Sequence, residues 1–149
     1  MEIKKLDKKD VSDFRSLIEI FKTVFENDEP IACEEQLSWL LANPDFMVFV
    51  VKLNNTVIGG LTIYVLHSFY KTKPQAYVYD VGIAPNFQGK GFGKTLMETV
   101  CNFCEINGFG GLYVEAEADD EDAVCFYQRT SFQQQMNAVH FTYQFSNNN

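Results

Sequence analysis

The hydrophobic positions of this 149-residue chain follow two kinds of period, which predict helices and strands. Apolar residues recur every three or four positions, as on one face of a helix, over 11–25, 34–41, 92–106 and 120–129. Runs rich in β-branched and aromatic residues predict strands at 3–6, 46–53, 56–66, 76–83 and 112–118. The stretch 133–145 predicts one or two further strands, and residues 146–149 a frayed tail.

Residues that start and stop regular structure support these boundaries. Asp10 stands where a helix N-cap is expected, and Asn54-Asn55 separates two strands as a hairpin turn would. In the second helix, Leu37, Trp39 and Leu40 are the candidate anchors. The order β-α-α-β-β-β-α-β-α-β predicts an α/β fold, with a mixed, mostly antiparallel sheet flanked by helices, in a single domain over residues 1–149.

Composition and charge narrow the class of protein. Hydrophobic residues make up 46% of the chain and aromatic residues 15%, which favours a folded globule. The formal net charge of −8 argues against a nucleic-acid partner, because such proteins carry a basic footprint. No apolar run is long enough for a membrane span, and the charged start MEIKKLDKKD differs from a signal peptide. We therefore expect a cytoplasmic protein with no membrane partner.

The four cysteines do not indicate a metal or redox centre. Cys101 and Cys104 form a C-x-x-C pair, but inside the helix predicted after residue 92 rather than at its N-terminus. Cys33, Cys125 and the two histidines are not spaced like the rest of a zinc site. We therefore expect no metal, and we expect Cys101 and Cys104 to be buried against the sheet.

A glycine-rich turn between residues 88 and 94 is the most informative stretch of the chain. It holds three glycines and two lysines between a predicted strand and a predicted helix. The first amides of a helix lack internal acceptors, and glycines let that backbone approach a phosphate closely. The spacing lacks the last glycine of a dinucleotide fingerprint, and Gln88 stands where a Walker A loop needs its first glycine.

The spacing Gln88-x-x-Gly91-x-Gly93 resembles the Q/R-x-x-G-x-G/A signature of the GNAT N-acetyltransferase superfamily, in the same strand, turn and helix context. The resemblance implies that the turn binds the pyrophosphate of acetyl-coenzyme A, and that backbone groups of the preceding strand hold the pantetheine arm. The implied coenzyme-binding residues are Val81, Gly82, Ile83, Gln88, Gly89, Lys90, Gly91, Phe92, Gly93 and Lys94. The two lysines are equally well explained as ordinary solvated side chains.

Acidic residues gather around the expected site. Asp80 lies inside a strand otherwise suited to burial, so it either makes a structural bond or faces the site, to bind an ammonium group or accept its proton. Glu115 and Glu117 alternate on the next predicted strand and are expected to share a face. Residues 119–122 are all acidic, which also suits a helix N-terminus.

Two further likenesses imply roles for individual residues. The segment 123–132 resembles the superfamily's second motif, A-x-x-x-Y-x-x-x-G-F, with Ser131 in place of the glycine. It implies that Tyr127 protonates the leaving thiolate, or that it only packs on the pantetheine. Over residues 14–145 the chain looks like the aminoglycoside 3-N-acetyltransferases, most specifically at Tyr77–Val81 and Val114–Glu117. Asp122 departs from that pattern, in which proline is usual.

This closer resemblance implies a polycationic amine substrate that is acetylated on the 3-amine of deoxystreptamine. Asp80 and Tyr127 are the candidate catalytic residues. The carboxylates expected to bind the substrate are Asp80, Glu115, Glu117, Asp120 and Glu121. Two alternatives stay open, namely an acetyltransferase for a polyamine or a protein amine, and a non-catalytic acyl-coenzyme A sensor. The aromatic-rich final strands are candidates for pairing across a homodimer.

Overall fold

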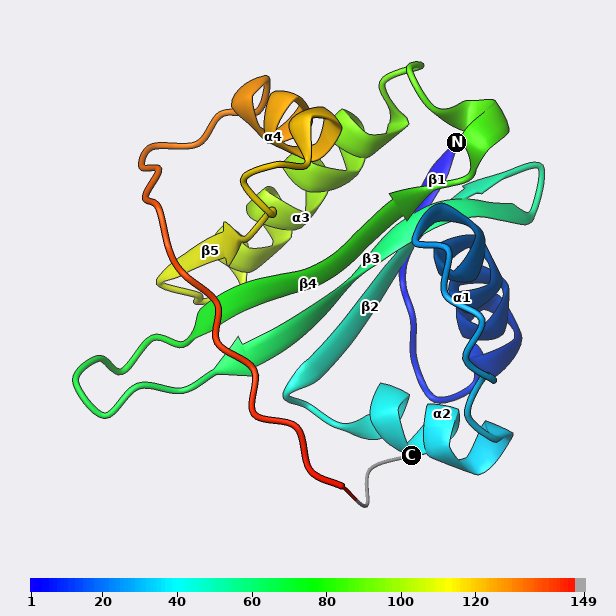
Figure 1. Cartoon of the computed structure of the whole chain (residues 1–149). Helices are drawn as coiled ribbons and strands as arrows, with labels where there is room; N and C mark the ends of the chain where they lie inside the picture. The colour runs from blue at the N-terminus through cyan, green and yellow to red at the C-terminus, as the bar shows by residue number, and fades with distance from the viewer. Residues whose placement is uncertain (147–149) are drawn as a thin grey trace. The chain divides into compact units, whose positions relative to one another are not determined.

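A computed structural model describes residues 1–146 of the chain (Figure 1). Internal contacts divide the chain into two compact units, Met1–Glu115 and a second that begins at Ala116, and each is described by itself. A single domain over residues 1–149 stays a prediction. Of the predicted tail 146–149, residues 147–149 lie outside the described residues.

The first unit holds the strands of the sheet and three α-helices. Its elements are β1 (Glu2–Lys5), α1 (Val11–Val24), α2 (Glu34–Ala42), β2 (Phe46–Leu53), β3 (Thr56–Leu66), β4 (Gln75–Ile83), a 3₁₀ turn (Pro85–Phe87), α3 (Phe92–Ile106) and β5 (Gly111–Val114). In the described part of the second unit lies α4 (Glu121–Gln128). The hairpin strands 46–53 and 56–66 are confirmed. Asn54 and Asn55 between them have φ values of 48° and 66°, both left-handed, as a tight hairpin turn requires.

The five strands form one sheet in the order β1-β2-β3-β4-β5. All neighbouring pairs are antiparallel except β4 and β5, which are parallel. The prediction of a mixed, mostly antiparallel α/β sheet is therefore confirmed. Helices α1 and α2 cover one face and α3 covers the other (Figure 1).

Alternation along β2 supplies the core on both faces of the sheet. Phe46 and Val48 join Phe14 of α1 in one buried cluster. Phe49 points the other way, and its ring centroid lies 5.1 Å from that of Phe103 in α3. Each helix thus buries its apolar stripe against an opposite face of the same strands.

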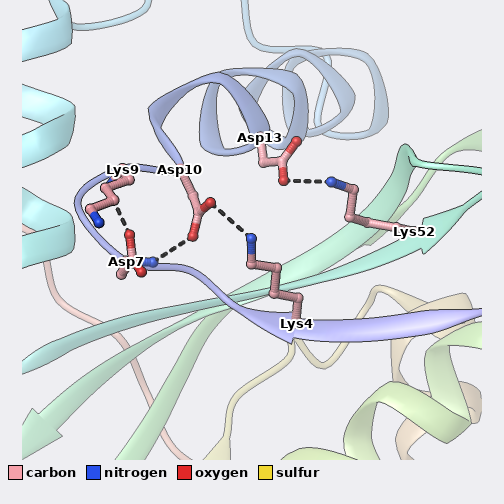
Figure 2. A network of polar contacts seen from close by, with 6 residues as sticks. All are labelled: Lys4, Asp7, Lys9, Asp10, Asp13 and Lys52. Carbon is pink, nitrogen blue, oxygen red and sulfur yellow. Dashed lines mark hydrogen bonds and ion pairs between the residues drawn. The ribbon is translucent and has the colours of Figure 1, made fainter.

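Ion pairs, rather than a side-chain cap, hold the start of α1 (Figure 2). Asp10 stands at the N-cap, as predicted, but makes no side-chain cap hydrogen bond. Its carboxylate instead accepts from the Asp7 amide at 2.9 Å and pairs with Lys4 of β1 at 2.9 Å. Lys52 of β2 pairs with Asp13 at 2.7 Å. Two strands therefore anchor the N-terminal end of α1, whose C-terminal residues Phe21 and Lys22 line the groove on this face that is described below.

Two strand predictions for the C-terminal third were wrong. β5 ends at Val114, so Glu115 and Glu117 lie beyond it and do not share a strand face. The residues that follow are alanine, aspartate and glutamate, which are all depleted in strands. Residues 133–145 form no strand, and every one of them is exposed. An alternating sequence becomes a strand only beside a partner, and no ladder in the described chain includes this segment.

Two burial predictions were also wrong. Trp39 is 60% exposed, whereas Leu37 is buried and Leu40 packs, partly buried, against the same core cluster, as predicted. The other buried residue of α2 is Leu41, one helical turn after Leu37. Cys104 is buried as predicted, but Cys101 is exposed. Cys101 follows the buried Val100 by one residue and is thus rotated by about 100° around α3.

Candidate active site

A β-bulge in β4 directs Asp80 to the α1 face of the sheet. The register between β3 and β4 shifts at this point, which leaves both Tyr79 and Asp80 opposite Thr62. The Asp80 amide donates to Thr62 Oγ1 at 3.2 Å. Consecutive residues of a regular strand point to opposite faces, whereas here Tyr79 and Asp80 line the same groove.

The groove has a volume of about 530 Å³ and lies wholly within the first unit. On its strand side it is lined by Thr62, Tyr64, Tyr79 and Asp80. On its other side it is lined by α1, by the loop between α1 and α2, and by Leu37 and Leu40 of α2. It is therefore a mixed site, with aromatic and aliphatic walls and with Asp80 and Glu29 as its acidic lining residues.

Burial raises the pKa of the Asp80 carboxyl above the usual value for aspartate. The side chain is half-buried, so its negative charge is poorly hydrated. Such a carboxylate gains more from an incoming ammonium group than an exposed one does, and it is a stronger base. Asp80 can therefore bind an amine and take a proton from it.

Hydrogen bonds order the loop that closes the groove. Lys22 Nζ at the end of α1 donates to the Glu29 carbonyl at 2.8 Å, and the Glu29 amide donates to Asn27 Oδ1 at 2.8 Å. All three residues line the groove. No motif or spacing in the sequence predicts a role for them. The signal was the polar run 26–29 immediately before Pro30.

β4 extends beyond the reach of β5. The parallel ladder between the two strands covers Gln75–Val78, whereas the ladder of β4 with β3 continues to Ile83. In the first unit, Val81–Ile83 therefore have a ladder partner on the β3 side alone. An edge of this kind can hydrogen-bond an extended ligand arm as if it were an added strand. This is the segment where the resemblance predicts the pantetheine arm.

The glycine turn follows that open edge directly. Gly89 and Gly91 have φ values of 73° and 88°, and Gly91 is the N-cap of α3. A Cβ at either position would meet no heavy atom within 4 Å, so backbone conformation, not crowding, requires glycine. Gln88 Nε2 donates to the Ile83 carbonyl at 2.9 Å and so ties the turn to the end of β4.

The two lysines of the turn have partners on the protein surface. Lys90 Nζ lies 5.6 Å from the ring centroid of Phe87. Lys94 Nζ lies 4.0 Å from Glu98, one helical turn further along α3. Their contact with a phosphate stays a prediction.

Four of the predicted site residues belong to the second unit. Asp120 is the N-cap of α4, and its Oδ1 accepts from the Ala123 amide at 3.1 Å, so part of the acidic cluster has a structural task. Glu121 begins the helix, Tyr127 lies near its end, and Glu117 precedes it. The structure brings Asp80, the open strand edge and the glycine turn together. The approach of Glu117, Asp120, Glu121 and Tyr127 to them stays a prediction.

Within residues 1–146, no helix is long and apolar enough to cross a membrane. The same residues include no cluster of three or more His, Cys, Asp or Glu side chains placed to hold a metal ion. Burial raises the pKa of the Cys104 thiol to about 11, which keeps it protonated and unreactive at neutral pH.

Comparison with known proteins agrees with this geometry. The pattern of the acetyltransferase (GNAT) family matches residues 14–132, so the chain belongs to that family. An aminoglycoside acetyltransferase from an uncultured soil metagenomic sample, solved in complex with trehalose, is 38% identical. The match covers 97% of this chain and 96% of that one, with a TM-score of 0.95. Its complex with sisomicin matches at 37% identity with the same coverage and TM-score.

A curated relative matches over a shorter span. The mycothiol acetyltransferase of Catenulispora acidiphila is 38% identical over 66 residues. Those residues cover 44% of this chain and 21% of that protein. The chain therefore spans much less than the full length of this relative.

Proposed function

We propose that this chain transfers the acetyl group of acetyl-coenzyme A to a primary amine of a polycationic aminosugar. The 3-amine of an aminoglycoside antibiotic is the preferred acceptor, and antibiotic resistance is the consequence. The observation that carries the proposal is the half-buried Asp80 in a groove beside an open strand edge. Family membership supports the coenzyme, and the relative solved with sisomicin supports the class of acceptor.

The proposed reaction begins when an ammonium group of the acceptor enters the groove and pairs with Asp80. The carboxylate takes one proton, directly or through a water molecule, and leaves a neutral amine. The amine nitrogen attacks the thioester carbonyl carbon, whose oxygen accepts from a backbone amide of Val81–Ile83. When the carbon–sulfur bond breaks, the coenzyme thiolate leaves and takes a proton, for which Tyr127 is the proposed donor. The nitrogen loses its second proton as the amide forms, and that proton, passed on through water, restores the tyrosine.

The remaining ammonium groups of the acceptor are proposed to meet further carboxylates. These are Glu115, Glu117, Asp120 and Glu121. We also propose that the protein acts in the cytoplasm, where acetyl-coenzyme A is available, and that it acts as a homodimer. Light scattering of the purified chain tests the dimer, and cell fractionation tests the location.

The test is thiol release from acetyl-coenzyme A with sisomicin, spermidine and a basic peptide at matched concentrations. Fast release with sisomicin, reduced about 100-fold or more in Asp80→Asn, is the expected result, because a general base typically contributes that much. Glu105→Gln, which removes an exposed carboxylate of α3 on the other face of the sheet, is the matched control.

Thiol release only with spermidine or the peptide would show that the acceptor is a polyamine or a protein amine and not an aminosugar. Coenzyme A binding without release for any of the three acceptors would favour the sensor.

A further inference from the structure

Tyrosine side chains form a continuous row on the face of the sheet that carries the groove. The tyrosine row consists of Tyr64 of β3, Tyr79 and Tyr77 of β4, and Tyr113 of β5. Its consecutive ring centroids lie 5.5, 5.9 and 4.7 Å apart. Tyr64 and Tyr79 line the groove beside Asp80, so the row leads from the groove across the sheet to β5.

Strand register is what aligns these rings. Tyr64 is the cross-strand partner of Tyr77, and Tyr77 is the partner of Tyr113. Directly opposed residues point to the same face of a sheet, so all three lie on one side. Tyr79 lies two residues after Tyr77 and so shares its face by regular alternation, and the bulge brings Asp80 to the same side. Phe46, the partner of Tyr64 on β2, belongs to the buried core.

Three of the four rings in the tyrosine row are exposed, and Tyr77 is partly buried. The exposed fractions of Tyr64, Tyr79 and Tyr113 are 40%, 56% and 41%. Tyr77 and Tyr113 stack with an interplanar angle of 14°. Exposed, adjacent aromatic rings of this kind are more typical of a binding surface than of packing alone.

A carboxylate stands at each end of the tyrosine row. Asp80 lies at the groove end, and Glu115, which belongs to the same unit, hydrogen-bonds the hydroxyl of Tyr77, the ring that stacks on Tyr113 at the other end. Burial and that hydrogen bond raise the pKa of Tyr77 to about 12, so its hydroxyl stays a donor at neutral pH. The row therefore joins ring faces, hydroxyl donors and two negative groups.

We propose that the tyrosine row is a stacking platform for the non-reacting rings of a polycationic saccharide, bound with its reactive amine at Asp80. The proposal deepens the proposed function and rests on it for the position of the reactive amine. Sugar rings present C–H faces that pack on aromatic rings, and ammonium substituents are attracted to the same π faces. Glu115 would bind an ammonium group at the far ring. A flexible polyamine offers charge but no flat face.

Equilibrium binding tests the platform separately from catalysis. Sisomicin and spermidine are titrated by calorimetry into the full chain saturated with coenzyme A, so no turnover is needed. Tyr113→Ala is expected to weaken the affinity for sisomicin about fivefold, equivalent to about 1 kcal/mol at 1.4 kcal/mol per tenfold. The affinity for spermidine is expected to stay nearly unchanged. Tyr113→Phe keeps the ring face and is expected to restore sisomicin binding.

The matched control is Tyr70→Ala, which removes an 86% exposed ring whose recorded ring contact is with its neighbour Phe69. If Tyr113→Ala lowers the melting temperature too far, Tyr79→Ala serves as the second variant. Unchanged sisomicin affinity in the alanine variant, or an equal loss for spermidine, would overturn the proposal. A failure of the proposed function would give a different result. Sisomicin would then still bind with an affinity that depends on the tyrosine row, but it would not be acetylated.

Discussion

Gly91→Ala and Gly108→Ala form a matched pair of variants. Comparing them separates the effect of a lost glycine on folding stability from its effect on coenzyme A binding. Gly91 begins α3 with a φ of 88°, and Gly108 follows α3 with a φ of 84°. A Cβ at either position would meet no heavy atom within 4 Å. The two substitutions therefore impose the same backbone strain without a steric clash.

The expected loss of folding stability follows from the left-handed backbone conformation alone. A non-glycine residue there costs about 1–2 kcal/mol. For a chain of this size, each kcal/mol lowers the melting temperature by about 2–4 °C. Urea unfolding is expected to show this loss in both variants, in similar amounts.

Coenzyme binding is expected to distinguish the two variants. The methyl group at residue 91 would occupy open space at the N-terminus of α3, where the phosphates are proposed to bind. Calorimetric titration with coenzyme A should show a loss of about tenfold or more for Gly91→Ala, equivalent to about 1.4 kcal/mol, and none for Gly108→Ala. Equal affinities in the two variants would refute the assignment of the turn.

Three further predictions concern single groups. Since burial raises the pKa of Asp80, this group's stabilising contribution is present at low pH and is lost as pH rises through its folded-state pKa. Asp80→Asn should therefore raise the melting temperature at pH 7.5 and not at acidic pH; a lower value at pH 7.5 would contradict the burial argument. Glu115→Gln should lower the pKa of Tyr77 from about 12, so that an ultraviolet titration shows this tyrosine ionising at a lower pH. An unchanged titration curve would show that Glu115 does not hydrogen-bond Tyr77. Tyr127→Phe should lower kcat about 100-fold at unchanged coenzyme A affinity if the hydroxyl is the proton donor, whereas wild-type kcat would leave it a packing role.

Local sequence signals predicted the parts of the fold that depend on near neighbours. Asn54-Asn55 identified the hairpin because few residues adopt two successive left-handed conformations. The spacing of Gln88, Gly91 and Gly93 predicted the turn, and Gly91 has there a φ of 88°, which glycine tolerates. Both features are fixed by residues a few positions apart.

Features that depend on distant partners could not be predicted in this way. Strict alternation along β4 would put Tyr79 and Asp80 on opposite faces, and only the register with Thr62 on β3 shows the bulge. The tyrosine row joins three strands, so its existence depends on pairings that the sequence does not state. The alternating pattern of residues 133–145 did not produce a strand for the same reason, because alternation says nothing of a partner.

The most direct test of the account is to incubate the purified chain with acetyl-coenzyme A and sisomicin, and to locate the acetyl group in the product by NMR. We expect one acetyl group on the 3-amine, formed by the wild-type chain and hardly at all by Asp80→Asn. Unmodified sisomicin, with acetyl-coenzyme A intact, would contradict it.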